Sequence, residues 1–154
     1  MTLVYLKNKF DAFNLLRRYN IYTMSKGEIR IPAGLTVWQH ELATAEALAK
    51  AGYVVEFLPI DSRKDAKSPD VVMSGEKWEI KSPKTDKLSA VERNLKRATK
   101  QSGNIVIDSK RMSKLQDRTV QKFLISKYKQ QRTIKNLIFI NRQRLVIDIS
   151  TLVK

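Results

Sequence analysis

Apolar residues recur along the chain at two different spacings, and each spacing predicts a different kind of element. Positions three or four residues apart predict helices over about residues 4–19, 36–50, 88–103 and 113–131. Short apolar runs predict strands around residues 27–34, 53–58 and 104–108, and two hairpins at about 70–81 and 137–149. The alternation of these elements predicts a single-domain α/β or α+β layer fold.

Two of the predicted helices carry end signals. In the helix at 88–103, Ser89 and Glu92 have the spacing of a capping box, and Gly103 is placed as its C-cap. Gly52 supplies the stop for the helix at 36–50. The apolar stripe of this second helix, which we expect to face the core, consists of Trp38, Leu42, Ala45 and Ala49.

The chain carries a large excess of positive charge. Its 154 residues include 30 Lys and Arg against 15 Asp and Glu, a formal net charge of +15 at pH 7. Such an excess favours a partner rich in phosphate, with nucleic acid ahead of anionic lipid. No apolar run approaches the roughly 20 residues that a membrane span needs, and the first residues lack the pattern of a signal peptide. We therefore expect no membrane span.

Cysteine is absent, and histidine occurs once, as His40. The absence of cysteine excludes disulfides, thiolate zinc sites and cysteine nucleophiles. A single histidine cannot build a histidine-rich metal site, so carboxylates are the plentiful metal ligands. We expect His40 to be an ordinary residue in the first turn of its helix.

The hairpin at 70–81 places two acidic side chains opposite each other. If Ser74 and Gly75 form a two-residue turn, Asp70 faces Glu79 across the hairpin, about 4.5–5.5 Å away at Cβ. Strand alternation puts Lys81 on the same face as Glu79. The opposite face carries the apolar residues Val71, Trp78 and Ile80.

Like charges that face each other in a sheet destabilise it unless a positive charge lies between them. A divalent cation would supply that charge. Lys81 could then orient or deprotonate a water beside the ion, or neutralise charge that develops on a phosphate. The plain alternative is a solvated strand face whose charges serve solubility.

Because Pro69-Asp70 is followed by Glu79-Ile80-Lys81, the chain resembles the PD-(D/E)xK nuclease superfamily. The segments "HELATAEALAKAGYVVEFLP", "PDVVMSGEKWEIKSP" and "VERNLKRATKQSGNIVID" are also similar to the transfer-RNA-cleaving C-terminal toxin domains of contact-dependent growth inhibition proteins. The resemblance implies a restriction-endonuclease-like mixed sheet flanked by helices. Residues 1–35 would then be a helical N-terminal extension of the same domain, and residues 36–154 the nuclease core.

The resemblance also implies roles for the hairpin residues. Asp70 and Glu79 would be metal ligands, and Lys81 would assist the attacking water. Magnesium is the expected ion, because carboxylate and phosphate oxygens suit it, with manganese or zinc as alternatives.

A glutamate in the helix at 36–50 would complete the implied site. Glu41 and Glu46 flank the apolar stripe at roughly 70° on either side, so periodicity does not choose between them. We favour Glu41 as the catalytic metal ligand, because the resemblance begins with His40-Glu41, and we keep Glu46 in reserve.

The helix at 88–103 presents a polar edge that could line a cleft beside Lys81, although a hydrated helix border is the simpler interpretation. The candidate substrate-binding residues on and after this helix are Asn94, Arg97, Lys100 and Gln101.

Residues 110–135 hold nine Lys or Arg and one acid, Asp117, which predicts a nucleic-acid surface whose affinity falls with salt. Tyr19, Trp38 and Tyr128 could stack on exposed bases, but core packing is the simpler role for each.

We therefore expect a metal-dependent phosphodiesterase that cleaves RNA, with transfer RNA as the substrate that the resemblance implies. A DNA endonuclease of a restriction or mobile-element system and a non-catalytic basic RNA-binding module are the alternatives. The resemblance further implies delivery into the cytoplasm of a target bacterium as part of a larger secreted protein. It also implies an acidic immunity protein in the producing cell.

Overall fold

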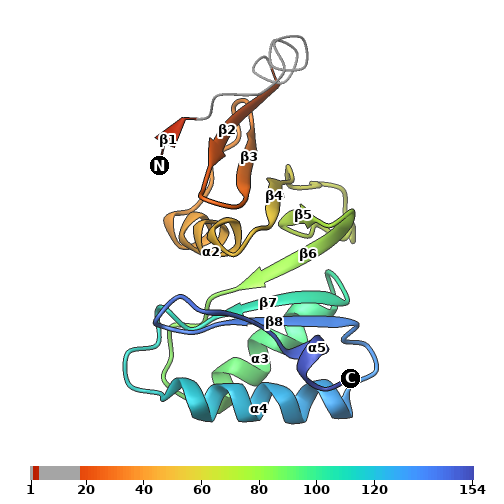
Figure 1. Cartoon of the computed structure of the whole chain (residues 1–154). Helices are drawn as coiled ribbons and strands as arrows, with labels where there is room; N and C mark the ends of the chain where they lie inside the picture. Colours follow the sequence, from red (N-terminus) through yellow and green to blue (C-terminus); the bar gives the residue numbers. More distant parts are fainter. Residues whose placement is uncertain (1, 4–17) are drawn as a thin grey trace.

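The computed structural model describes residues 2–3 and 18–154, and in these residues the strands form one mixed sheet (Figure 1). The strands are hydrogen-bonded in the order in which they occur along the chain. They are β1 (Thr2–Leu3), β2 (Tyr19–Thr23), β3 (Glu28–Pro32), β4 (Val54–Phe57), β5 (Val71–Met73), β6 (Glu76–Lys81), β7 (Asn104–Asp108), β8 (Asn136–Ile140) and β9 (Val146–Asp148). The pairs β3–β4, β6–β7 and β7–β8 are parallel, and the other neighbours are antiparallel.

Helices cover both faces of this sheet. They are α2 (Gln39–Lys50), α3 (Leu88–Thr99), α4 (Asp117–Gln130) and the short α5 (Ile149–Leu152). Leu48 of α2 belongs to a core that includes Val106 of β7, whereas Leu95 of α3 and Leu124 of α4 belong to a second core with Ile105. Because adjacent residues of a strand point to opposite faces, α2 lies on one side of the sheet and α3 and α4 on the other (Figure 1). The described residues thus form a single α/β domain.

The order of elements agrees with the prediction from the second helix onward. α2, β4, the β5–β6 hairpin, α3, β7, α4 and the β8–β9 hairpin all form close to their expected positions. The chain from residue 61 to 69 is a loop, as its polar composition predicts. The sequence pattern did not indicate β2 or α5.

The register of the β5–β6 hairpin confirms the predicted two-residue turn. Val71 pairs with Trp78, and Met73 pairs with Glu76. Ser74 and Gly75 both have positive φ, 51° and 75°, which is the backbone conformation of a type I′ hairpin turn. The turn therefore fixes which side chains of β6 point towards which face of the sheet.

Three predicted details of the helices are wrong. α2 begins at Gln39, so Trp38 precedes the helix and is 71% exposed rather than part of the core. α3 begins at Leu88 after Lys87, and no side chain caps it, so Ser89 lies inside the helix and forms no capping box. The C-cap is Lys100 rather than Gly103.

Gly103 has a different role, which is to allow a close approach between two segments. A Cβ atom at this position would lie 3.1 Å from the carbonyl oxygen of Thr133, and the carbonyl of Gly103 accepts a hydrogen bond from the amide of Lys135 at 2.8 Å. A larger residue would push the segment before β8 away from β7.

The N-terminal prediction can be compared with the structure only in part. The helix expected over residues 4–19 falls mainly on residues 4–17, which lie outside the described residues, and Tyr19 begins strand β2 instead. In the described part of residues 1–35 the chain forms β1, β2 and β3. None of the helices in the described residues is long and apolar enough to cross a membrane.

Candidate active site

Asp70 is held against the middle of β6 by two hydrogen bonds. Its amide donates to the carbonyl of Trp78 at 3.0 Å, and its carboxylate Oδ2 accepts from the amide of Ile80 at 2.7 Å. The two partners, Trp78 and Ile80, are the residues directly before and after Glu79 in β6. The hairpin therefore fixes the Asp70 carboxylate beside Glu79, as the two-residue turn predicts.

Glu79 is a buried acid, and only one of its two carboxylate oxygens has a hydrogen-bond partner among the described residues. Its side chain is 5% exposed, and its Oε1 accepts a charge-assisted hydrogen bond from Nζ of Lys81 at 2.5 Å. Its Oε2 is buried and has no hydrogen-bond partner among the described residues. Because a buried carboxylate oxygen without a partner is costly, this atom marks a place where a ligand would stabilise the site.

The pKa of Glu79 is raised from its ordinary value of 4.5 to about 7. Burial is the largest cause and the neighbouring carboxyl group of Asp70 adds to the rise, while the ammonium group of Lys81 opposes it. Burial also raises the pKa of Asp70, against the hydrogen bond from Ile80 and the charge of Lys81. The site therefore favours a bound proton or another positive charge between the two carboxyl groups.

In metal-free buffer we expect Glu79 to make the free energy of unfolding fall between about pH 4.5 and 7. The unfolded side chain ionises near 4.5 and the folded one near 7, so the folded chain holds the extra proton in this interval. The contribution of protonated Glu79 to the free energy of unfolding is complete below pH 4.5 and is lost as the pH rises through 7. Glu79→Gln stays neutral and should remove this component.

Urea unfolding of the wild type and Glu79→Gln at pH 5 and pH 7.5, both in chelator, measures this effect. The wild type should lose stability relative to the variant at the higher pH. A constant difference between the two proteins would show that Glu79 titrates normally.

Glu41, in the first turn of α2, lies in the electric field of the hairpin site. Burial and then the charge of Asp70 raise its pKa, while Lys81 and Arg111 lower it. Glu46, one turn further along, lines a surface cavity with Lys84 and Arg111. Glu41 is therefore near enough to Asp70 and Lys81 for their charges to affect its pKa, but in the described residues it does not form a three-carboxylate cluster with Asp70 and Glu79.

The described residues contain no ready-made cage of three or more His, Asp or Glu side chains for a metal ion. Asp70 and Glu79 nevertheless fit a hard cation, because one oxygen of Glu79 is buried without a partner and the two acids repel each other. Magnesium is commonly held by one or two carboxylates, with waters and substrate phosphates as its other ligands. The donor set suits that kind of site.

Arg111 is a nearby cation that the sequence analysis did not single out. Its Nε donates to the carbonyl of Ser82 at 3.0 Å and to the Ser82 hydroxyl at 3.2 Å, and its Nη2 also donates to the Ser82 carbonyl. Ser82 directly follows Lys81, so these bonds fix the guanidinium at the carboxyl end of β6. The only sequence signal was its position in the basic segment 110–135.

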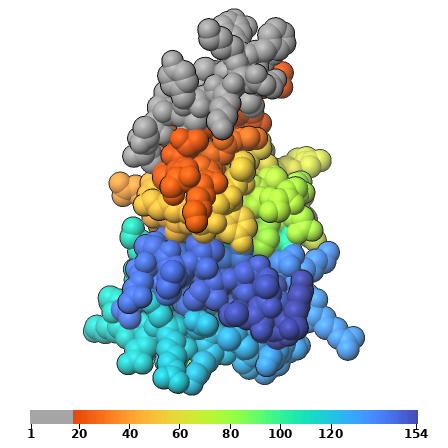
Figure 2. Space-filling view, viewed as in Figure 1, coloured from red at the N-terminus to blue at the C-terminus, as the bar shows by residue number. Residues whose placement is uncertain are grey.

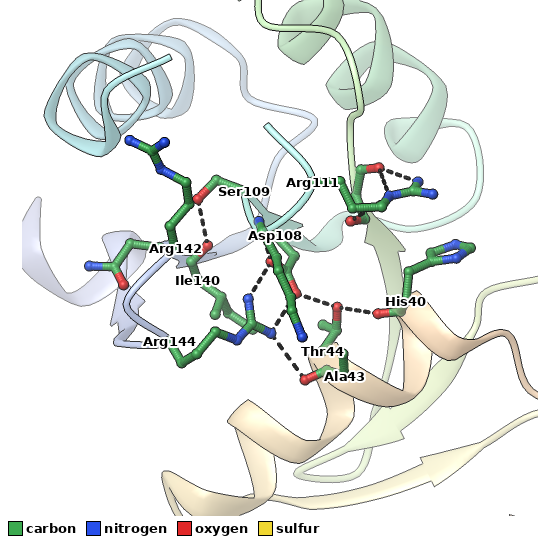
Figure 3. Close-up of polar contacts among 12 residues, drawn as sticks. His40, Ala43, Thr44, Asp108, Ser109, Arg111, Ile140, Arg142 and Arg144 are labelled. Atoms are coloured by element: carbon green, nitrogen blue, oxygen red, sulfur yellow. Dashed lines mark hydrogen bonds and ion pairs between the residues drawn. The ribbon is translucent and has the colours of Figure 1, made fainter. Parts of the chain in front are cut away.

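A buried ion pair links α2 to the sheet beside this site (Figure 3). Asp108, at the end of β7, is 1% exposed and accepts bonds from both terminal nitrogens of Arg144 at 2.7 and 2.8 Å. It also accepts from the Thr44 hydroxyl at 2.5 Å, and Arg144 donates to the carbonyl of Ala43 at 3.0 Å. The network holds the start of α2, with Glu41, against β7 and the β8–β9 turn.

The space-filling view agrees with this arrangement. In Figure 2 the blue residues that follow β8 pack directly beneath the gold residues of α2. Segments about 100 residues apart in the sequence thus meet next to the candidate site.

The predicted substrate-binding residues on and directly after α3 are not brought to Lys81 by any described contact. Gln101 accepts a hydrogen bond from the amide of Ser68 at 2.8 Å, and Asn94 donates to the carbonyl of Ala90 in its own helix at 2.8 Å. Arg97 and Lys100 are exposed. Gln101 therefore orders the loop that leads to Asp70, and substrate contact remains a prediction for all four residues.

The aromatic residues proposed for stacking have different environments. The ring of Tyr128 packs against the α3–α4 core, and its hydroxyl donates to the carbonyl of Lys135 at 3.3 Å. Tyr19 lies half-buried in β2. Trp38 differs from both because it is exposed.

Comparison with known proteins gives two matches. The family model described as "Contact-dependent growth inhibition CdiA C-terminal domain" matches residues 67–146, which is more than half of the chain. Among solved structures, the chain is similar to the "CdiA-CT/CdiI toxin and immunity complex from Burkholderia pseudomallei", with a TM-score of 0.57 and 22% identity over 71% of this chain and 80% of that chain. At this identity the structural match shows a shared fold. No curated protein matches the chain.

Proposed function

This chain belongs to the CdiA C-terminal domain family of interbacterial toxins, and on that premise we propose that it is a metal-dependent RNA phosphodiesterase. Transfer RNA is the proposed substrate, and the PD-(D/E)xK type of site is the proposed chemistry. The observation that carries the proposal is the Glu79 oxygen that is buried without a partner beside Asp70, with Lys81 bonded to the other oxygen of the same carboxylate.

In this proposal Asp70 and Glu79 hold the ion, and Glu41 contributes from α2. A bound Mg²⁺ would lower the pKa of a water and stabilise negative charge on the scissile phosphate. The ammonium group of Lys81 would lie next to the reacting phosphate. Its hydrogen bond to Glu79 fixes the direction in which that group points. Arg111, anchored on Ser82, adds a fixed positive charge at the same end of β6.

The net charge of +15 supports a phosphate-rich substrate. Purified protein should cleave total transfer RNA in Mg²⁺, and chelator should stop the reaction. Duplex DNA under the same conditions should stay intact. Cleavage of duplex DNA but not of transfer RNA would favour a DNA endonuclease, and cleavage unaffected by chelator would contradict a metal site.

We also propose that the producing cell protects itself with an acidic immunity protein, as the toxin and immunity complex of the similar structure suggests. Opposite net charges would speed association and make its rate fall as salt rises. Stopped-flow mixing with the cognate inhibitor at low and high salt tests this charge pairing. A rate that does not change with salt would contradict it.

A further inference from the structure

A surface cavity of about 800 Å³ opens next to the candidate active site. It is bounded by the start of α2, by the chain after β6 and by the chain after β7, so it lies at the carboxyl ends of two neighbouring parallel strands. Ligands of open α/β sheets commonly bind at that edge. Arg111, which lines the cavity, is bonded to Ser82, the residue that directly follows Lys81, so the cavity lies next to the candidate active site.

The cavity carries positive charge that no acid in the described residues neutralises by an ion pair. Lys84, Lys110 and Arg111 line it, and none of them is within 4.0 Å of a described carboxylate oxygen. Glu46 is the one acid among its lining residues. Asp108 lies nearby, but its carboxylate is occupied by Arg144 and Thr44. This distribution suits a phosphate.

Trp38 directly precedes Gln39 and His40, which line the same cavity, and it forms an aromatic platform with His40. Trp38 is 71% exposed, and its ring stacks on that of His40 with centroids 6.5 Å apart and an interplanar angle of 24°. His40 is half-buried, and its main-chain carbonyl accepts a bond from Thr44 at 3.0 Å, so the platform rests on the ordered start of α2 (Figure 3). Exposed aromatic rings together with a positively charged groove are the combination that proteins use to bind unpaired nucleotides, and here the indole stacks on His40, which lines the cavity with three cations.

From this combination we propose that the cavity binds an unpaired RNA nucleotide next to the scissile phosphate. Its base stacks on Trp38 and His40, and its phosphate contacts Lys84, Lys110 and Arg111. The choice of RNA as the ligand rests on the proposed function. The new element is that the RNA is single-stranded at the cleavage site. A base held in a duplex already stacks on its neighbours and cannot reach the indole.

The test uses the Asp70→Asn protein in chelator, so that binding is measured without cleavage. The probe is a short unstructured RNA oligonucleotide, and its duplex with the complementary strand is the comparison. Intrinsic fluorescence reports on the platform, because the only other tryptophan, Trp78, is 7% exposed. The single strand should bind more tightly than the duplex and should change the tryptophan emission.

When Trp38→Ala is added to the Asp70→Asn protein, binding of the single strand should weaken by about 5- to 150-fold, the range expected for losing one base–aromatic stack. Trp38→Phe should restore much of the affinity, and Lys84→Ala should weaken binding and reduce its salt dependence. Leu152→Ala and Lys26→Ala, which change exposed residues away from the cavity, are the matched controls and should bind normally.

Equal binding by the Trp38→Ala and parent proteins, or equal binding of single strand and duplex, would overturn the inference. Cleavage by the wild type is measured separately. A wild type that fails to cleave RNA while Trp38 still governs binding would refute the proposed function, and only the nucleotide-binding part of the inference would stand.

Discussion

Asp70→Asn is expected to lower RNA cleavage by about a thousandfold or more. The substitution removes one negative charge from the proposed ion site, and metal stabilisation of a phosphoryl transition state is worth several kcal/mol, with about 1.4 kcal/mol for each factor of ten in rate. Asparagine keeps an oxygen that can accept the bond from the Ile80 amide, so the hairpin should remain folded. Gel-resolved cleavage of transfer RNA measures the rate.

Glu79→Gln and Lys81→Met should also lose cleavage, for different reasons. The first removes the buried carboxylate, and the second removes the ammonium group that bonds to it. Asp65→Asn is the matched control, since Asp65 lies exposed in the preceding loop at φ 60°, a conformation that asparagine tolerates. Near-normal cleavage by Asp70→Asn would rule out this carboxylate as a metal ligand.

Arg144→Ala should lower the free energy of unfolding by about 3 kcal/mol, since removal of one partner of a buried pair leaves an unpaired charge. Asp108 is 1% exposed and, among the described residues, would keep only the Thr44 hydroxyl and the Lys110 amide as donors. The arginine also bonds to the carbonyl of Ala43. We therefore expect α2 to loosen, and cleavage to fall because Glu41 sits in its first turn. Urea unfolding measures the stability.

Arg63→Ala is the control for this experiment. It removes an arginine from an ion pair with Asp61 in which the arginine side chain is 83% exposed, so stability should change little. Equal effects of the two substitutions would mean that the Asp108 pair contributes no more than a surface pair. Arg144→Ala combined with Asp108→Asn should recover part of the loss, because no unpaired charge remains.

The hairpin site was predictable because its geometry is local. A two-residue turn fixes every cross-strand pair, so the neighbourhood of Asp70 and Glu79 follows from Ser74 and Gly75 alone. Local sequence spacing cannot decide between Glu41 and Glu46. The choice depends on how α2 is placed relative to β6, and helical periodicity contains no information about that placement.

Trp38 and Arg111 show what sequence spacing could not provide. Trp38 fits the apolar stripe of the predicted helix, but α2 begins at Gln39, directly after Trp38, and the indole is exposed. Arg111 looks like any other cation of the basic segment until its guanidinium is seen on Ser82, 29 residues earlier in the chain. The contacts of Asp108 with Arg144 and Thr44 are likewise set by the tertiary fold.

Calorimetric titration of Mn²⁺ into the metal-free protein tests the ion site most directly, because it needs neither substrate nor turnover. We predict one binding site per chain in the wild type and in Asp65→Asn, with affinity that rises with pH as Glu79 loses its proton. Asp70→Asn and Glu79→Gln should each abolish that binding. Absence of binding in the wild type, or unchanged binding in both variants, would contradict a metal-dependent nuclease at this site.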